Sequence, residues 1–379
     1  MSLAILNART LDPVSGIQNR VDLAVEQGKI VEIVPAGTLS STSFTNVIDA
    51  VEAFAFPGFV DFHTHLFRHG SAFGMDAERL LESGVVCGAD MGTAGWLNYS
   101  ALHECDLTGK RVELKAFINL SPVGQPGSGI NEPLGEASVD VMTRMKAHMK
   151  AYPGEIVGVK VRISRSIVGE LGLQPLKWAI AAGEELGLPV CVHTTDPPAR
   201  TGEVISLLRP GDIYSHTYQG RGHTILGPDG NLEPEIIEGQ RRGVLIEVGN
   251  GRLNFNFPVA QQAMAQGLFP DIISSDATIA TYHRDWAMWD LSFVASKFMA
   301  LGMPLAQVIQ AITVTPAKVL GVEDRFGILA EGREANIALC RLEDTPVTFR
   351  DSSGNELPGP KGIVPWMTIR CGEVVFEAE

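Results

Sequence analysis

The sequence predicts an α/β protein: a (β/α)8 TIM-type barrel with a small β-sandwich domain formed by both termini. Three observations lead to this fold class. Short apolar runs alternate with amphipathic stretches through the middle of the chain, both ends of the chain are rich in short strands, and metal-binding residue types stand where the central runs end.

Eight apolar runs bounded by turn residues are typical of buried parallel strands. They cover residues 58–65, 85–91, 113–121, 156–164, 189–194, 213–218, 244–250 and 271–276. Helices are expected between and after them, at residues 176–186, 203–208, 235–242, 258–266, 285–301 and 304–312. A doubly wound open sheet is the competing fold, but no G-x-G-x-x-G follows the first strand.

Both ends of the chain have β-branched runs separated by turn residues. The expected strands are residues 3–7, 21–25, 29–34, 45–49, 335–341, 365–371 and 373–376. We therefore predict that residues 1–55 and 327–379 form one composite β-sandwich domain, and that residues 56–326 form the barrel.

Composition excludes several classes of function. The 379 residues carry a net charge of −14 and contain no Lys/Arg run, which argues against a nucleic-acid partner. Five scattered cysteines without a C-x-x-C pair argue against a disulfide framework. No signal peptide or membrane-spanning run is evident, so we expect a cytoplasmic protein with a small-molecule substrate and no membrane partner. A homo-oligomer is compatible with this composition.

The first central strand ends in the sequence Phe59-Val60-Asp61-Phe62-His63-Thr64-His65. Residues i and i+2 of a strand point to the same side, so His63 and His65 can chelate one metal ion at the C-terminal end of the barrel. Alternatively, both histidines are hydrogen-bonded in the core.

Three further residues of the same kind end other predicted strands. His193 ends the fifth, His216 the sixth and Asp276 the eighth. Because active sites of such barrels lie at these strand ends, the set predicts a catalytic metal site with nitrogen and oxygen ligands.

Lys160 lies inside the fourth predicted strand. An ammonium beside metal cations would be costly, whereas carbon dioxide would convert its amine to a carbamate, an anion able to bridge two metals. An outward-facing lysine or an ion pair with an acid remains open.

The chain resembles the amidohydrolase superfamily over essentially its whole length. The resemblance rests on residues 57–65 (PGFVDFHTH), Lys160, His193, His216, Asp276, and the tail segments 315–317 and 327–337. It implies that His63, His65 and Asp276 hold one divalent metal ion and that His193 and His216 hold a second. Zinc is the expected metal, and the resemblance implies that carboxylated Lys160 and a hydroxide bridge the two ions. The hydroxide would attack a carbonyl, with Asp276 as the catalytic proton carrier.

Within the superfamily, segments 89–95, 160–165, 215–220 and 248–251 resemble dihydroorotase-like proteins, and most closely a deacetylase-like subgroup. Dihydroorotases carry an arginine where this chain has Phe67, and a histidine and a proline where it has Ala277 and Thr278. We therefore expect hydrolysis of an amide or ester bond in an acyloxy acid, such as acetyl-mandelate, or in an N-acyl compound. The deacetylase-like subgroup has a histidine in place of Asn250, which puts acetyl-mandelate itself in doubt.

Candidate substrate-binding residues follow the strands: Arg162, Tyr218, His223, Asn250 and Tyr282. A substrate carboxylate would favour Arg162, although an ion pair at the barrel mouth is an equal alternative. Two rival functions remain beside the deacetylase and a dihydroorotase: a mononuclear deaminase with unmodified Lys160, and a non-catalytic relative.

Overall fold

The computed structural model describes residues 2–12, 19–344, 347–359 and 362–378. Seven parallel strands form a curled sheet in the order β12-β11-β10-β9-β8-β7-β6. They are β6 (Phe59–Thr64), β7 (Val85–Gly95), β8 (Glu113–Asn119), β9 (Ile156–Arg162), β10 (Val190–His193), β11 (Ile213–Ser215) and β12 (Leu245–Glu247). Each lies where the sequence predicts a barrel strand.

The eighth predicted strand, residues 271–276, closes the barrel through isolated bridges. Ile272 pairs in parallel with Glu247 of β12, and Ala277 pairs in parallel with Thr64 of β6. The backbone N–H of Asp276 donates to the His63 carbonyl (2.8 Å), which joins the last segment to the first strand. The barrel prediction is therefore confirmed.

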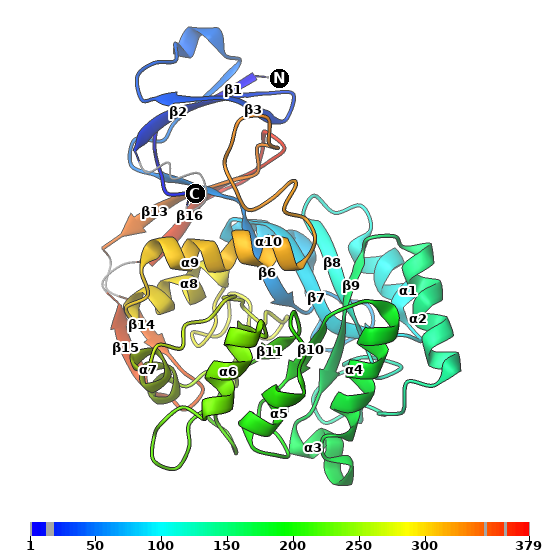
Figure 1. Ribbon diagram of the computed structural model, residues 1–379. Coiled ribbons are helices and arrows are strands. Elements are labelled where there is room, and N and C mark those ends of the chain that lie inside the picture. The colour runs from blue at the N-terminus through cyan, green and yellow to red at the C-terminus, as the bar shows by residue number, and fades with distance from the viewer. Residues whose placement is uncertain (1, 13–18, 345–346, 360–361, 379) are drawn as a thin grey trace.

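Helices cover the outside of the barrel, and α4, α5 and α6 follow one another across it (Figure 1). The helices are α1 (Tyr99–Leu102), α2 (Val139–Ala151), α3 (Arg165–Val168), α4 (Gln174–Leu186), α5 (Thr201–Leu207), α6 (Pro234–Arg242), α7 (Phe257–Ala265), α8 (Leu291–Ala300), α9 (Leu305–Ile312) and α10 (Val314–Val319). Short helical turns cover Ser41–Ser43, Ala77–Ser83, His103–Leu107 and Gly169–Leu171.

Helix α8 begins later than predicted, at Leu291 instead of residue 285. The Asp290 side chain accepts a hydrogen bond from the Phe293 N–H and so caps the helix. Trp289 before it has a positive φ of 53°, which an α-helix does not contain. Residues 286–288 therefore form a turn before the helix.

The two ends of the chain pair in one eight-stranded sheet, ordered β17-β16-β13-β5-β1-β2-β3 with β4 beside β1. Its strands are β1 (Ser2–Thr10), β2 (Arg20–Glu26), β3 (Lys29–Pro35), β4 (Asn46–Asp49), β5 (Phe54–Pro57), β13 (Ile337–Glu343), β16 (Gly362–Arg370) and β17 (Glu373–Glu377). Both termini lie in this region, above the barrel in Figure 1. A separate hairpin, β14 (Val347–Arg350) and β15 (Glu356–Gly359), packs near α8.

The predicted boundary between the two domains falls inside β5, which pairs with β1 and β13 and continues across Gly58 into β6. The terminal sheet also contacts the helical layer, where the Ile363 N–H of β16 donates to Ser296 Oγ of α8 (2.8 Å). The division into two domains stays a prediction.

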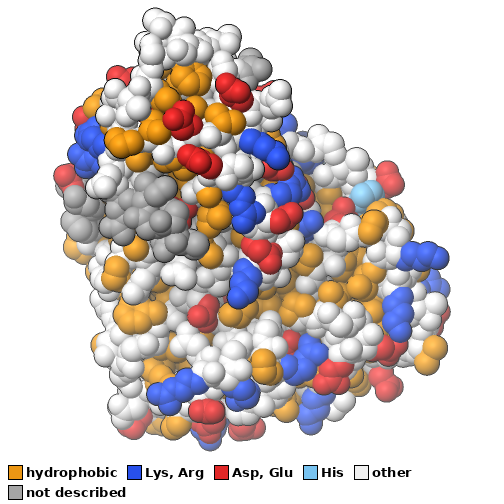
Figure 2. Space-filling view, turned by 45° about the horizontal axis from the view of Figure 1, so that its top comes forward, with side chains coloured by type: hydrophobic (Ala, Val, Ile, Leu, Met, Phe, Trp, Pro, Cys, Tyr) orange, Lys and Arg blue, Asp and Glu red, His pale blue; other side chains and the backbone are white. Residues whose placement is uncertain are grey.

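Charged side chains of both signs are dispersed over the face of the molecule in Figure 2. On the face in Figure 2, Lys and Arg alternate with Asp and Glu, and no broad basic area appears. None of the helices in the described ranges is long and apolar enough to cross a membrane.

Candidate metal centre

The six predicted metal ligands come together at the C-terminal ends of the barrel strands. A cavity of about 420 Å³ opens there, and five of them line it: His63, His65, Lys160, His193 and Asp276. His216 lies deeper, with its ring centroid 4.2 Å from that of His193 and 5.1 Å from that of His63.

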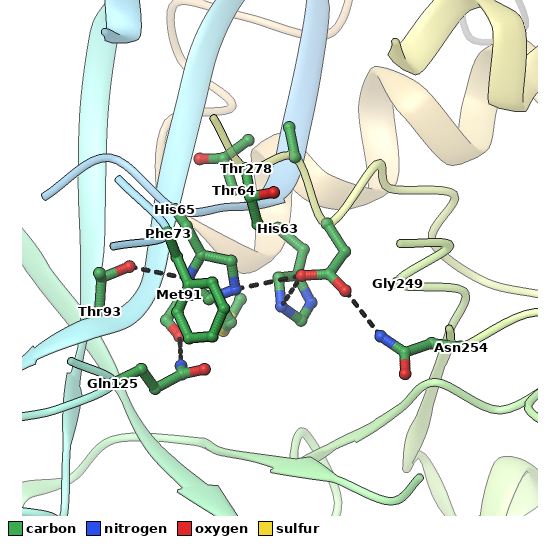
Figure 3. A network of polar contacts seen from close by, with 12 residues as sticks. His63, Thr64, His65, Phe73, Met91, Thr93, Gln125, Gly249, Asn254 and Thr278 are labelled. Atoms are coloured by element: carbon green, nitrogen blue, oxygen red, sulfur yellow. Dashed lines mark hydrogen bonds and ion pairs between the residues drawn. The ribbon is translucent and has the colours of Figure 1, made fainter. Parts of the chain in front are cut away.

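His63 at the end of β6 and His65 just after it both face the carboxylate of Asp276. Asp276 Oδ1 lies 3.4 Å from His63 Nε2 and 3.1 Å from His65 Nε2. On its other side, the His65 ring meets Thr93 Oγ1 through Nδ1 (2.7 Å), so it is held between Thr93 and the carboxylate (Figure 3). The remaining ring nitrogen of His63, Nδ1, faces Glu247 Oε1 at 3.3 Å.

His216 has a nitrogen available for a metal. Its Nδ1 donates to the Gly249 carbonyl (2.7 Å), which places the ring proton on Nδ1 and leaves a lone pair on Nε2. That Nε2 is buried without a hydrogen-bond partner among the described residues. Buried polar atoms without partners are rare, so the residues present fit a cation at this point.

Burial also keeps these imidazoles in the form that binds metal. It lowers the pKa of His63, lowers that of His193 well below its usual value, and lowers that of His216 to about 3. All three rings are therefore neutral at pH 7, and neutral imidazole is the ligand form. His63, His216 and Asp276 each place one ligand atom within 4.8 Å of the others.

Asp276 is held in a strained backbone conformation with a φ of +54°. Its Oδ2 accepts a hydrogen bond from Asn254 Nδ2 (2.7 Å; Figure 3). Gly251 leaves room for the carboxylate, because a Cβ at that position would collide with Oδ2. Burial would raise the pKa of Asp276. In the acidic range where this carboxylate titrates, attraction by protonated His63 and His216 and the hydrogen bond with His65 outweigh burial and hold the pKa well below its usual value.

Lys160 is almost completely buried on β9. Its Nζ lies 3.7 Å from Cys191 Sγ on the neighbouring strand. No ion pair joins it to an acid within the described part of the chain. Gly92, with a φ of +73°, makes room for it, since a Cβ there would lie 2.5 Å from Lys160 Cβ.

Of the five residues predicted to bind substrate, Arg162 lines the cavity. Three others point into the core: Tyr218 donates to the Leu268 carbonyl (3.1 Å), Tyr282 donates to the Arg79 carbonyl (2.8 Å), and the Asn250 amide donates to the Ala287 carbonyl (2.8 Å). His223 lies in the loop after β11, outside the set of described residues that line the cavity.

The structure adds residues that the sequence argument missed. Glu247, buried on β12, contacts His63 and accepts from Ser274 Oγ. Glu247 could have been recognised in the sequence, because it is an acid inside the apolar run Val244-Leu245-Ile246-Glu247-Val248. Asn254, which contacts Asp276, and Glu132, which contacts Arg162, lie in loops without a periodic pattern and could not be recognised from the local sequence.

The fold and the site define a class: barrel hydrolases whose strand ends gather histidines and an aspartate around a metal site. Residues 54–359 match the model of the Amidohydrolase family. A deacetylase of Agrobacterium fabrum is 31% identical over 342 residues, which cover 89% of this chain and 82% of that protein. This chain therefore belongs to the amidohydrolase family and is a hydrolase.

Two solved structures share the fold across nearly their whole length. The crystal structure of a dihydroorotase matches with a TM-score of 0.87 at 28% identity, covering 100% of this chain and 98% of that one. The crystal structure of an adenine deaminase matches with a TM-score of 0.88 at 24% identity, covering 99% of each chain. The second likeness concerns the fold alone. Members of the family generally use divalent metal ions.

Proposed function

We propose that this hydrolase is a deacetylase-like enzyme that cleaves the C–O or C–N bond of an acyl group on a small, carboxylate-bearing substrate. The observation that carries the proposal is the convergence of neutral imidazoles and one carboxylate on a single cavity. The relative from Agrobacterium fabrum, named a deacetylase, supports the choice of reaction. A cytoplasmic location and a homo-oligomer stay predictions.

The residues fit two divalent ions, with zinc as the expected metal. His63, His65 and Asp276 would hold one ion, and His193 and His216 the other, with a carboxylated Lys160 between them. When bound, such ions would lower the pKa of a water molecule and polarise the substrate carbonyl.

Carboxylation of Lys160 is supported by its surroundings. An ammonium buried without an acid partner is unfavourable, and its contact in the described structure is a thiol. Burial raises the pKa of Cys191 to about 12, so that thiol is neutral and offers no compensating charge.

Asp276 is positioned to move a proton. Its Oδ1 faces the two imidazoles, while Asn254 fixes Oδ2. A carboxylate fixed in this way can take a proton from the attacking water and deliver it to the leaving nitrogen or oxygen. Asp276 is therefore our candidate for the catalytic general base and acid.

Positive charge at the cavity favours an anionic substrate. Arg162, Arg221 and Arg252 all line the cavity, although the whole chain carries a charge of −14. Guanidinium groups pair with carboxylates through two parallel hydrogen bonds. A small acid that also carries an acyl group suits both the arginines and the metal site.

The test is a substrate screen with protein reconstituted with zinc. Acyloxy acids, N-acyl amino acids, cyclic amides and adenine are incubated with the enzyme, and release of acid, acetate or ammonia is measured. We expect turnover of an acyloxy or N-acyl acid. Turnover of dihydroorotate alone would replace the proposal with the dihydroorotase reading, which the 28% identical crystal structure keeps as the second candidate. Release of ammonia from adenine would identify a deaminase instead.

A further inference from the structure

We infer that Arg221 is the residue that binds the substrate carboxylate and so determines specificity for acids. This inference deepens the proposed function and rests on it. Arg221 lies in the loop that follows β11 and lines the same cavity as the metal ligands.

The other two cavity arginines are already paired with protein acids. Arg162 Nη1 lies 2.9 Å from Glu132 Oε1 and donates to Gln125 Oε1 (3.1 Å). Arg252 Nε lies 3.2 Å from Asp285 Oδ2. A substrate carboxylate would have to share either guanidinium with a protein carboxylate, which reduces the positive charge that the substrate meets.

Arg221 has no such partner. Among the described residues, no carboxylate forms an ion pair with its guanidinium, and its side chain is exposed to the cavity and to solvent. It therefore provides an uncompensated positive charge at the cavity, with all its guanidinium N–H groups available to an incoming anion.

The loop that carries Arg221 is held in place on both sides. The Arg221 N–H donates to Gln219 Oε1 (2.6 Å), and Gln219 Nε2 donates to the His223 carbonyl (2.8 Å). The flanking glycines allow close packing on neighbouring loops. A Cβ at Gly220 would lie 2.8 Å from Asn256 Cβ, and a Cβ at Gly222 would collide with Asp196 Oδ1. Because the backbone is already ordered, binding an anion costs less conformational entropy.

The position of this loop relative to the metal ligands indicates which groups the substrate carries. Arg221 follows His216, a proposed metal ligand, by five residues, and Asp196 follows His193 by three. Both loops reach the cavity, so an anionic group at Arg221 and a scissile carbonyl at the metal site belong to one small molecule. The substrate class is a carboxylic acid whose hydroxyl or amino group carries the acyl group.

The experiment compares an acid with its neutral twin. The acyl acid that wild type hydrolyses fastest is assayed beside the primary carboxamide of the same compound, and acetate release gives kcat/KM for both. We expect R221M to lower kcat/KM for the acid by about 10- to 100-fold more than for the carboxamide, because a charge-assisted pair is lost. R221K should recover part of the preference, since it keeps the charge but lacks the planar fork.

R252M is the matched control, because it removes an arginine of the same cavity that is already paired with an acid. We expect R252M to change kcat/KM for the acid and kcat/KM for the carboxamide by the same factor. An unchanged acid preference in R221M, or a collapse of that preference in R252M, would overturn the inference.

A binding measurement separates this inference from the proposed function. Mandelate and mandelamide are titrated calorimetrically into zinc-loaded wild type and R221M. If no acyl compound is hydrolysed but R221M selectively weakens mandelate binding, the proposed function fails and the role of Arg221 stands. If acyl acids are hydrolysed and mandelate binds both proteins equally, the role of Arg221 fails alone.

Discussion

At the scale of single residues, the proposed proton transfer by Asp276 can be removed with one conservative substitution. Asparagine has nearly the same shape, but it cannot accept and return a proton. We expect Asp276→Asn to lower kcat by about 10²- to 10⁴-fold, the range typical of a lost general acid or base. The measurement is kcat on the best substrate of the screen, with excess zinc present and metal content checked by elemental analysis.

Full turnover by the Asp276→Asn variant would contradict the role given to this residue. Ser128, which also lines the cavity, offers a control of similar location, and Ser128→Ala should keep kcat within a few-fold of wild type.

The metal-ligand candidates could be recognised in the sequence because each one ends or occupies a predicted strand. Once the strands are placed, the barrel brings their C-terminal ends together, and the histidines meet without further information. The residues around them could not be recognised in this way. Asn254 reaches Asp276 from a loop, and Glu132 reaches Arg162 from 30 residues away along the chain, so both contacts depend on tertiary structure.

At the scale of elements, apolar runs predicted all seven strands of the parallel sheet, and turn-rich ends predicted most of the terminal sheet. The pattern failed where it was short, interrupted or weakly apolar. Strand β5 has four residues and α10 has six, and neither was predicted. The 13-residue helix α2 was not predicted either, because it buries little more than Met142 and Met145 and so has a narrow apolar face. The predicted start of helix α8 was too early, because Trp286 and Trp289 continue its apolar pattern in front of the true start. The Asp290 cap, which sets that start, is visible only in the structure.

The close approach of β7 to the Lys160 side chain of β9 depends on Gly92. A side chain at this position would have to adopt a positive φ and would also meet Lys160. We expect Gly92→Ala to lower the free energy of unfolding by about 2–4 kcal/mol, from left-handed strain plus crowding, and to reduce metal content. Chemical denaturation and elemental analysis are the measurements.

Gly187 supplies the control for that substitution. It has a φ of +68°, close to that of Gly92, but a Cβ there meets nothing within 4 Å. Gly187→Ala should therefore lose only about 1–2 kcal/mol through strain and keep its metal content. Equal losses in both variants would mean that crowding of Lys160 has no effect.

Helix α8 carries a buried lysine that links the barrel to the β14–β15 hairpin. Lys297 Nζ donates to Asn250 Oδ1 (2.9 Å) and to the carbonyls of Ala287 (2.6 Å) and Arg350 (3.2 Å). Burial lowers its pKa to about 7, and the attraction of Asp351 and Asp285 offsets this only in part.

This shift has a definite sign. The unfolded chain binds a proton at this lysine up to about pH 10.4, whereas the folded chain releases it near pH 7. The unfolded state therefore holds more protons between these values, and stability rises with pH across that window. We expect the free energy of unfolding of wild type, relative to Lys297→Met, to increase by about 2 kcal/mol from pH 7 to pH 9.

Denaturant unfolding of both proteins at several pH values measures this difference. Lys177→Met, at an exposed position of α4, is the control and should follow the wild-type curve. A pH-independent difference between wild type and Lys297→Met would show that the lysine keeps its ordinary pKa.

At the scale of the whole molecule, the metal site is the place where the barrel closes. Its proposed ligands come from β6, β9, β10, the end of β11 and the closing segment at Asp276. That segment joins the first and seventh strands through isolated bridges instead of a continuous ladder. Ions held by these ligands would therefore connect the first, middle and last parts of the barrel.

Removal of metal should consequently destabilise the entire fold. A ligand that binds only the folded state adds RT ln(1 + [L]/Kd), about 2.7 kcal/mol at 100 times Kd. We expect dialysis against a chelator to lower Tm by several degrees, and zinc to restore it.

His216→Ala removes the buried nitrogen that has no protein partner among the described residues, so the Tm of this variant should respond less to the chelator. A Tm in wild type that is identical with and without metal would mean that the ligands do not hold an ion in the folded protein. Calorimetric scans of the two proteins, each with and without zinc, distinguish these results without relying on activity.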